Sequence, residues 1–595
     1  MLPRDSLFSF LFLLLCVHCH GDAQYGAYDV LIGGGSLSAL AAALTLGNLT
    51  NTQEGEKKVR IAYLEITDWP GGQLTSSLVP PDFGPLNEAA ENLPASFVDL
   101  LLAVGSIDGE WESNPGECWV STKCFSSKLG VEYIMGLLNS YPNVDVYLNT
   151  AIKSVQTNGH SKVTELQAIK RTKRSRANDN NYNDNGNSKN DDDEYSQLLS
   201  KSLKDWYNPI PSEEFEKSVL NFSADVFIEG TEFGDILMNT ASVMGLEEDL
   251  AVSGYEQPYE LSEHYVSNCG QSSVFPFVLS YSNDSESNID EINRQNGNFV
   301  KHDDEYSFGT SNWSDIWAYR RIDTGVGLDG EKCSEGQQSN QNWDGGNDYT
   351  GNYIFLSIED CFKQIKSSSG WAGCINIEAL KGMEEHAYGW MNYFVTHADK
   401  ETQQRLSVNT TQTMTRHGLS KMPYIRDTRR SKRGIDGFRL SYAEGLNVSA
   451  ADCTTSIRYN DTVAIGNYIY LDVHELNVND ACPGVSSYPD YLSQVDMSWG
   501  GLLPYYIPFR ALTSQHLENV LISGKGMAQT FMANAGTRFH PTEWSTGVAA
   551  GAAAFIMSTE TKTVRDVYEY DIKRLQNILE ERLRSPLTWS ICAST

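Results

Sequence analysis

The sequence predicts an α/β protein whose first domain is built around a parallel β-sheet. Three observations support this prediction. An apolar run over residues 28–32 leads into a glycine turn, an Ala- and Leu-rich segment over 39–46 follows it, and a second apolar run over 59–64 ends at Glu65. A strand, a tight turn, a helix and a second strand that ends at an acid are typical of a βαβ unit.

The turn of this βαβ unit has the residue types that a diphosphate requires. Gly33 permits the tight bend, and Gly35, which Ser36 follows, lets the backbone approach a phosphate, while the small Ser38 lets helix and strand pack. The helix N-terminus then faces the anion. Glu65 can accept hydrogen bonds from a ribose, although a polar loop makes its distance from the turn longer than the usual ~20 residues. The pattern predicts a dinucleotide site, and the alternative is a glycine-rich loop in an unrelated α/β protein.

Further elements follow in order along the chain. The sequence predicts two strands within 144–170, a polar insertion over 171–195, a strand over 224–228 that enters a second glycine turn, a strand near 519–523, and helices over 547–556 and 564–583. A chain of 595 residues is too long for a single core. We expect a signal peptide over 1–24, a first domain formed by 25–150, 151–245 and 481–595, and a mixed α+β substrate domain over 246–480 interleaved with it.

The N-terminus and the charge of the chain indicate its compartment. Arg4 precedes an apolar run over 7–17, which is shorter than the roughly 18 residues that a membrane span needs, so it predicts a cleavable signal peptide. The net charge of −32 disfavours nucleic acid as a partner. We therefore expect a protein that is secreted or in the lumen of the secretory pathway, without a membrane span. Glycosylation sequons agree with this and occur at Asn48, Asn221, Asn283, Asn312, Asn409, Asn447 and Asn460.

Cysteine usage predicts disulfide bonds. Of the 11 cysteines, Cys16 and Cys19 lie in the expected signal peptide, which leaves nine. In an oxidising compartment most of these should pair, and an odd number leaves at least one unpaired within the chain. Proximity in the sequence favours two pairs, Cys118 with Cys124 and Cys453 with Cys482. Among these nine cysteines, no CxxC or CxxH spacing indicates a zinc site.

Several ordered blocks of the sequence resemble a family of FAD-dependent oxidoreductases, with a glutathione-reductase-like Rossmann domain, over nearly the whole mature chain. These blocks lie at 68–76, 114–121, 227–235, 347–349, 424–430, 472–474, 521–525 and 538–547. The resemblance implies that FAD is the cofactor. It also implies that the loop with Gly71, Gly72 and Gln73 contacts the flavin side, that Asp235 lies in a second flavin motif, and that Gly524 and Gly547 belong to a C-terminal flavin motif.

The same resemblance, together with chemistry, indicates candidate catalytic residues. Oxidation of a C–H or N–H bond by a flavin needs a group that takes a proton, and a neutral histidine suits this task. His474 and His540 lie in blocks that resemble segments beside the flavin or the substrate. Arg426 and Arg538 could clamp a carboxylate or stabilise a reduced flavin, or could be buried ion-pair partners.

The function that the sequence predicts is a secreted FAD-dependent oxidase or dehydrogenase that transfers hydride from a small organic substrate. A redox-neutral isomerase or hydratase that contains FAD is one alternative, and a binding glycoprotein without catalysis is another. No second glycine-rich βαβ unit is evident, which disfavours a reductase driven by NAD(P)H.

Overall fold

The computed structural model describes residues 24–51, 58–83, 89–111, 113–174, 195–283, 286–296, 305–325, 333–446, 458–466, 468, 471–477, 482 and 504–589. The expected signal peptide, except for its last residue, and the central part of the expected insertion lie outside these ranges. Asn447 and Cys453 also lie outside them. What the sequence predicts there stays a prediction.

A seven-stranded mixed sheet is the largest sheet of the molecule. Its strands run in the order β3-β2-β1-β6-β5-β4, and β19 pairs with β6. β1, β2, β3, β6 and β19 are mutually parallel where they pair, while β5 runs antiparallel to β4 and β6. The strands are β1 (Gln24–Gly33), β2 (Ile61–Leu64), β3 (Val144–Tyr147), β4 (Thr150–Thr157), β5 (Val163–Lys173), β6 (Phe215–Glu229) and β19 (Val520–Ile522). This is the predicted α/β fold with a parallel sheet of Rossmann type.

The sheet joins distant parts of the chain through β6. Its first part, from Phe215 to Ser223, pairs with β5, and its last part pairs with β19 on the same side, so that Phe227 faces Val520. β1 pairs with the other side of β6 from Gln24 to Gly33. Strands from the beginning, middle and end of the chain therefore meet in one sheet.

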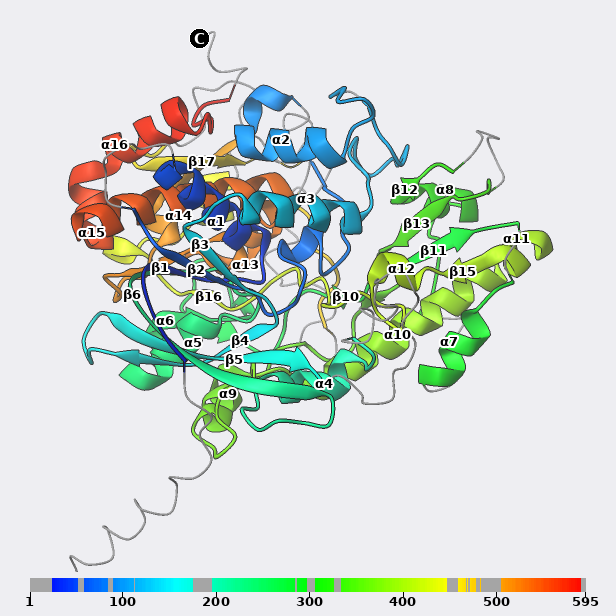
Figure 1. The fold of residues 1–595 in the computed structure, drawn as a ribbon, viewed down its shortest axis with the longest axis horizontal. Helices are drawn as coiled ribbons and strands as arrows, with labels where there is room; N and C mark the ends of the chain where they lie inside the picture. Colours follow the sequence, from blue (N-terminus) through cyan, green and yellow to red (C-terminus); the bar gives the residue numbers. More distant parts are fainter. Residues whose placement is uncertain are drawn as a thin grey trace, which may run out of the picture.

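Two long helices lie together beside this sheet. α1 (Leu37–Asn51) follows the glycine turn, and α14 (His540–Glu560) comes from the C-terminal region. In Figure 1 the blue α1 lies beside the orange α14, although about 500 residues of sequence separate them. A Cβ on Gly547 would lie 2.1 Å from the carbonyl oxygen of Ser38, so only glycine permits this approach of the two helices.

The region between β6 and β19 contains a second, antiparallel sheet with the strand order β12-β13-β11-β15. Figure 1 shows this sheet with α7, α8, α10 and α11 at the right, away from β1 and β2. The strands are β11 (Phe277–Tyr281), β12 (Arg321–Asp323), β13 (Gln338–Gln341) and β15 (Leu406–Val408). The helices are α7 (Ile289–Asn296), α8 (Trp313–Tyr319), α10 (Ile377–Thr396) and α11 (Lys400–Arg405).

Other helices complete the fold. α4 (Leu199–Trp206), α5 (Asp235–Met244), α6 (Glu247–Leu250) and α9 (Ile358–Ile365) lie near the lower edge of the sheet in Figure 1. α2 (Ala95–Val104) and α3 (Ser127–Asn139) lie near its upper edge, and α13 (Phe531–Thr537) precedes α14. None of the helices in the described ranges combines the length and apolarity that a bilayer crossing requires.

Three disulfide bonds are present among the described residues. Cys118 pairs with Cys124, as predicted, and Cys361 pairs with Cys374. The predicted pair of Cys453 with Cys482 is wrong, because Cys482 bonds instead to Cys269, 213 residues away in the sequence. Proximity in the sequence failed here because the fold brings distant segments together. Three disulfides fit an oxidising compartment.

Candidate functional site

The glycine turn leaves backbone amides at the start of α1 available for a ligand. Gly33 is the last residue of β1, and Gly35 has a positive φ of 128°. The Ser36 Oγ accepts a hydrogen bond from the amide of Ala39. Among the described residues, no acceptor contacts the amides of Leu37 and Ser38. Free amides at a helix N-terminus bind anions such as a diphosphate.

The loop with Gly71 and Gly72, called the second-glycine loop below, packs directly on the glycine turn that precedes α1. Gly72 has a φ of +55°, and a Cβ on it would lie 2.6 Å from both the carbonyl oxygen of Gly35 and the Cα of Ser36. Gly71 also has a positive φ, of 116°. Any larger side chain at Gly72 would separate the loop from the turn. The structure thus brings together two segments that the sequence assigned to one cofactor.

Glu65 lies directly after β2 and is fully buried. The Tyr63 hydroxyl donates to its Oε2 at 2.7 Å, and the amide of Thr67 donates to its Oε1 at 3.4 Å. Burial raises the pKa of this carboxyl to about 8, although both hydrogen bonds oppose the shift. No basic side chain among the described residues pairs with Glu65, so its oxygens are suited to the hydroxyl donors of a ribose.

The C-terminal motif with Ser523 and Gly524 also contacts the start of α1. The Ser523 hydroxyl donates to the Ser38 hydroxyl at 3.0 Å, and Ser38 in turn lies 2.9 Å from the hydroxyl of Ser36. Gly524 begins the 3-10 helix η10 (Gly524–Gly526), and a Cβ on it would lie 2.5 Å from the Ser38 Oγ. Ser38 and Ser523, 485 positions apart in the sequence, therefore line one buried polar region, which we call the cofactor core.

Gln73 connects the second-glycine loop to the start of α14. It lies in the 3-10 helix η1 (Gly72–Leu74), and its amide donates to Glu543 at 2.5 Å and to the carbonyl oxygen of Arg538 at 3.1 Å. The buried oxygens Gln73 Oε1, Glu543 Oε1 and Glu232 Oε1 have no hydrogen-bond partner among the described residues. Buried polar atoms without partners are rare and point to a missing ligand. Together with the free amides of α1, they fit a cofactor that offers both phosphate oxygens and hydroxyl groups, as FAD does.

Asp235 lies apart from this core. It is the first residue of α5, and its Oδ1 accepts hydrogen bonds from the Trp371 indole at 2.6 Å and the Tyr207 hydroxyl at 3.0 Å. Glu229, at the end of β6, instead accepts from the amides of Thr231 and Leu237 and so fixes the turn before α5. Both carboxylates thus bond to protein donors around the second glycine turn.

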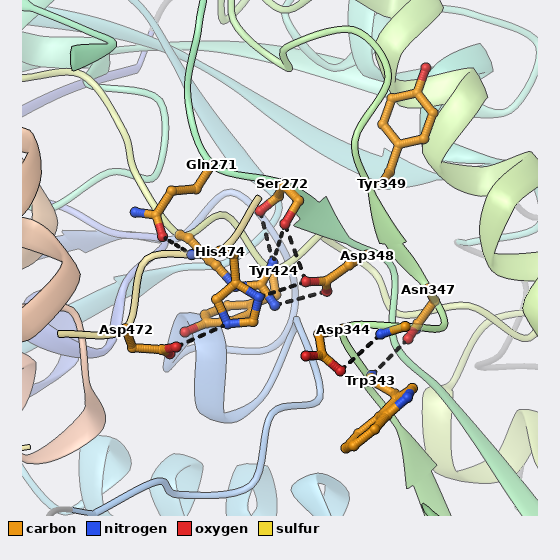
Figure 2. A network of polar contacts seen from close by, with 12 residues as sticks. Gln271, Ser272, Trp343, Asp344, Asn347, Asp348, Tyr349, Tyr424, Asp472 and His474 are labelled. Carbon is orange, nitrogen blue, oxygen red and sulfur yellow. Dashed lines mark hydrogen bonds and ion pairs between the residues drawn. The ribbon is translucent and has the colours of Figure 1, made fainter. Parts of the chain in front are cut away.

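A cavity of about 940 Å³ is lined by residues from the region between β6 and β19. Trp343 and Tyr349 line one part of it, and Asp348, Asp472 and His474 line another. Figure 2 shows the imidazole of His474 between the carboxylates of Asp348 and Asp472. A cavity of this size suits a small organic molecule.

His474, two aspartates and two arginines form one continuous network at this cavity. His474 Nδ1 lies 2.7 Å from Asp348, and its Nε2 lies 3.4 Å from Asp472. Arg426 donates to Asp348 at 2.8 Å and to the carbonyl oxygen of Ser272. Arg538 pairs with Asp472. Arg538 also donates to the hydroxyl of Tyr424 at 2.5 Å, and Figure 2 shows Tyr424 behind His474.

The network determines the protonation of its members. Burial and Arg426 oppose protonation of His474, but Asp472 and Asp348 favour it and raise its pKa above the ordinary value. Burial opposes ionisation of both aspartates, but His474 and the neighbouring arginines hold their pKa values well below the usual range. The two carboxylates therefore favour the imidazolium form of His474.

His540 is in a different environment. It is the first residue of α14, its Nδ1 accepts a hydrogen bond from the amide of Asp82 at 3.2 Å, and its Nε2 lies 3.1 Å from the carbonyl oxygen of Val79. Burial and Arg320 lower the pKa of His540 to about 3. Its neutral ring thus has both nitrogens bonded to the backbone, and it holds the 79–82 segment against α14.

Several residues of the site received no role from the sequence. Glu232, Lys525 and Glu543 in the cofactor core, and Asp348 and Asp472 at the cavity, lie in the blocks that carry the family resemblance, but no contact between blocks could be read from them. The one available signal is a carboxylate inside such a block, and Glu543 is the only acidic residue of 538–547.

Comparison with solved structures gives low similarities. L-proline dehydrogenase from P. horikoshii is 15% identical with a TM-score of 0.16, and the aligned part covers 36% of this chain and only 24% of that protein. THI4 from Thermovibrio ammonificans is 13% identical with a TM-score of 0.22, over 38% of this chain and 67% of that one. A mutant of PqsL from P. aeruginosa is 10% identical with a TM-score of 0.29, over 96% and 94%. Values this low identify no substrate.

Comparison with sequences is decisive for the family. The search of curated proteins found no match. The family model described as "FAD dependent oxidoreductase" matches residues 29–178 and 209–579, which is most of the chain and includes the glycine turn, the second-glycine loop, the cavity network and the C-terminal motif. FAD is the cofactor and the general chemistry is redox. This protein belongs to the FAD dependent oxidoreductase family.

Proposed function

We propose that this chain is a secreted oxidase or dehydrogenase that transfers hydride to FAD from a small polar organic molecule bound in the cavity at His474. The supporting observation is a short path of contacts between the cavity and the cofactor core. Asp472 lines the cavity and pairs with Arg538, and the carbonyl oxygen of Arg538 accepts a hydrogen bond from Gln73 in the second-glycine loop. A substrate in this cavity would therefore lie close to the segments that hold FAD.

In this proposal, the cofactor is held by backbone and small side chains, and FAD supplies the hydride acceptor when it is bound. The start of α1 binds the diphosphate and Glu65 binds the ribose. The residues we assign to cofactor binding are Gly33, Gly35, Ser36, Ser38, Glu65, Gly71, Gly72, Gln73, Gly524 and Gly547, with Asp235 supporting the second glycine turn.

His474 is the group we assign to proton transfer. Asp348 binds Nδ1 closely, whereas Nε2 lies farther from its partner, so Nε2 is the nitrogen that can turn towards a substrate. A histidine oriented by a carboxylate is the usual arrangement of a general base. Nε2 of the neutral ring takes the proton that the substrate loses, while Arg426 and Arg538 keep the two aspartates ionised.

Secretion and the domain division are part of the same proposal. The leader with Arg4 and the three disulfides support export. Residues 25–245 and 481–595 form the FAD domain, and 246–480 form the substrate domain. Expression of the full chain in secreting animal cells should yield protein in the medium that begins near residue 25, as N-terminal sequencing would show. Intracellular protein with an intact leader would contradict export.

Catalysis is tested with the purified holoprotein. A screen of amines, alcohols, sugars and organic acids for peroxide release and dye reduction should find a class that also bleaches the flavin without oxygen. His474→Asn should abolish that turnover, whereas His160→Asn, at an exposed turn residue, should not. Reducible bound flavin with no substrate in any class would refute the proposal.

A further inference from the structure

We propose that Glu543 is a neutral carboxylic acid that donates a hydrogen bond from Oε1 to an acceptor oxygen of bound FAD, so that retention of the cofactor is lost at high pH. Glu543 would thus be a positioning residue for the cofactor, a role that the family assignment does not give it. The inference rests on FAD binding alone and not on the identity of the substrate.

Glu543 lies where the cofactor-binding segments converge. It is in the first turn of α14 and is fully buried. Its Oε2 accepts from Gln73 of the second-glycine loop at 2.5 Å. A Cβ built on Gly524 of the C-terminal motif would lie 2.9 Å from its Oε1 and 2.5 Å from the Oγ of Ser38, which follows the phosphate turn. Its Oε1 therefore lies among all three segments.

The charge balance of the core favours a proton on Glu543. Lys525 is the buried cation of this region, and its ammonium group donates to Glu232 at 2.6 Å and to the carbonyl oxygen of Ile425 at 2.7 Å. Glu543 receives no hydrogen bond from it. If both glutamates were ionised, the core would contain two buried anions and one cation, which is costly in a low-dielectric interior. The proton remains on the carboxyl that has no direct cationic partner.

A proton on Glu543 then requires an acceptor. Oε1 has no hydrogen-bond partner among the described residues, and a buried hydroxyl without an acceptor is destabilising. Bound FAD offers phosphate and hydroxyl oxygens to this core. In agreement with this geometry, burial and Glu232 raise the pKa of Glu543 to about 8, although Lys525 and Gln73 oppose the shift.

The titratable groups near Glu543 act with known signs. Glu232 and Lys525 face it from the second glycine turn and from η10. Glu65, whose pKa is also near 8, faces Glu232 from the end of β2. Glu65 should bind the ribose hydroxyls better when it is ionised, so its titration favours retention at high pH. Glu543 has the opposite effect, because ionisation removes a donor and places an anion beside an anionic cofactor.

The experiment compares FAD dissociation from holoprotein between pH 6 and pH 10, followed by flavin fluorescence, in wild type and Glu543→Gln. Glutamine retains a donor and an acceptor but does not titrate. The ratio of the wild-type Kd to the variant Kd cancels the contribution of Glu65. We expect this ratio to be constant below pH 8 and to rise about tenfold per pH unit above it, about 100-fold by pH 10. A ratio that does not change with pH overturns the proposal.

Glu384→Gln is the matched control. Glu384 is buried on α10, accepts from the amide of Ser200, and burial raises its pKa to about 7. This variant should release FAD with the wild-type pH dependence. If Glu543→Gln does not fold, Gln73→Leu provides a second test, because loss of the donor to Oε2 raises the pKa of Glu543 and moves the pH of FAD release upwards. An unmoved release profile in Gln73→Leu also overturns the proposal.

Discussion

At the cavity, each charge of the His474 network faces an opposite charge: Arg426 and His474 bond to Asp348, and His474 and Arg538 pair with Asp472. In the cofactor core, the one ion pair among the described residues is that of Lys525 with Glu232. Glu65 and Glu543 are fully buried without a basic partner, and three oxygens there lack any hydrogen bond among the described residues.

The difference shows which region balances its own charges without a ligand. The cavity network satisfies its own charges, so it is preorganised before a substrate arrives and needs little rearrangement during the reaction. The cofactor core has two buried carboxyl groups without a basic partner among the described residues, so bound FAD should stabilise the folded protein strongly. Variants in the core should therefore affect flavin retention first, and variants in the network should affect turnover first.

The largest expected effect comes from Gly35→Val. The φ of 128° strains any side chain, and a side chain there would fill the space beside the phosphate turn. We expect FAD affinity to fall by at least about 100-fold, roughly 3 kcal/mol, measured from the visible absorption of the purified protein before and after denaturation. Gly159→Val is the control, since Gly159 also has a positive φ, of 78°, but faces open space. Stoichiometric flavin in Gly35→Val would refute the placement of the diphosphate.

Asp348→Asn should show the second largest effect, on turnover. The change leaves Arg426 without its carboxylate and offers His474 Nδ1 a weaker partner. We expect kcat/KM to fall about 100-fold or more and stability to fall by about 3 kcal/mol, with FAD still bound. Asp344→Asn changes an exposed carboxylate of the same cavity and should retain most activity. A kcat/KM of Asp348→Asn close to the wild-type value would show that the network is not catalytic.

Glu65→Gln tests the cofactor core, with a smaller expected effect on FAD affinity. The amide replaces a carboxylate that accepts ribose hydroxyls, so we expect the Kd of FAD to rise about tenfold at pH 9, where the wild-type group is ionised. Fluorescence titration of FAD-depleted protein measures this. Turnover of the fully loaded enzyme should be nearly unchanged. An equal Kd in both proteins would remove Glu65 from the ribose site.

The smallest effect is a shift in pH dependence. His474 must lose its proton before it can act as a base, and its pKa is raised, so kcat/KM should increase as pH rises through that pKa and then level off. Asp472 is one cause of the raised pKa. Asp472→Asn should therefore move this rise in kcat/KM to lower pH. If kcat/KM of Asp472→Asn rises at the same pH as that of the wild type, a group other than His474 controls the pH dependence.

Local features of the site were predictable from the sequence. The order of strand, glycine turn, helix and Glu65 lies within about 40 residues, and each step depends on neighbouring residues, so the βαβ unit and its cofactor class could be predicted. The disulfide between Cys118 and Cys124, six positions apart, could be predicted for the same reason. The C-terminal motif could be assigned only through its resemblance to a family.

Contacts between distant segments could not be predicted. Gln73 and Glu543 are 470 positions apart, Asp348 and His474 are 126 apart, and Cys269 and Cys482 are 213 apart. No spacing in a single sequence reports such pairs. For this reason the two histidines were equal candidates, and only their surroundings separate the ion-paired His474 at a cavity from His540, which bonds to the backbone.

Neighbouring residues specify the fold class, the phosphate turn and a dinucleotide cofactor, because turn geometry and strand–helix alternation depend on short stretches of the chain, whereas the choice of FAD followed from the resemblance to a family. Which charges are paired and which are left for a ligand depends instead on the packing of distant segments. Burial and pairing depend on packing between β6, β19, α1 and α14, and those contacts form only when the ends of the chain meet in one sheet.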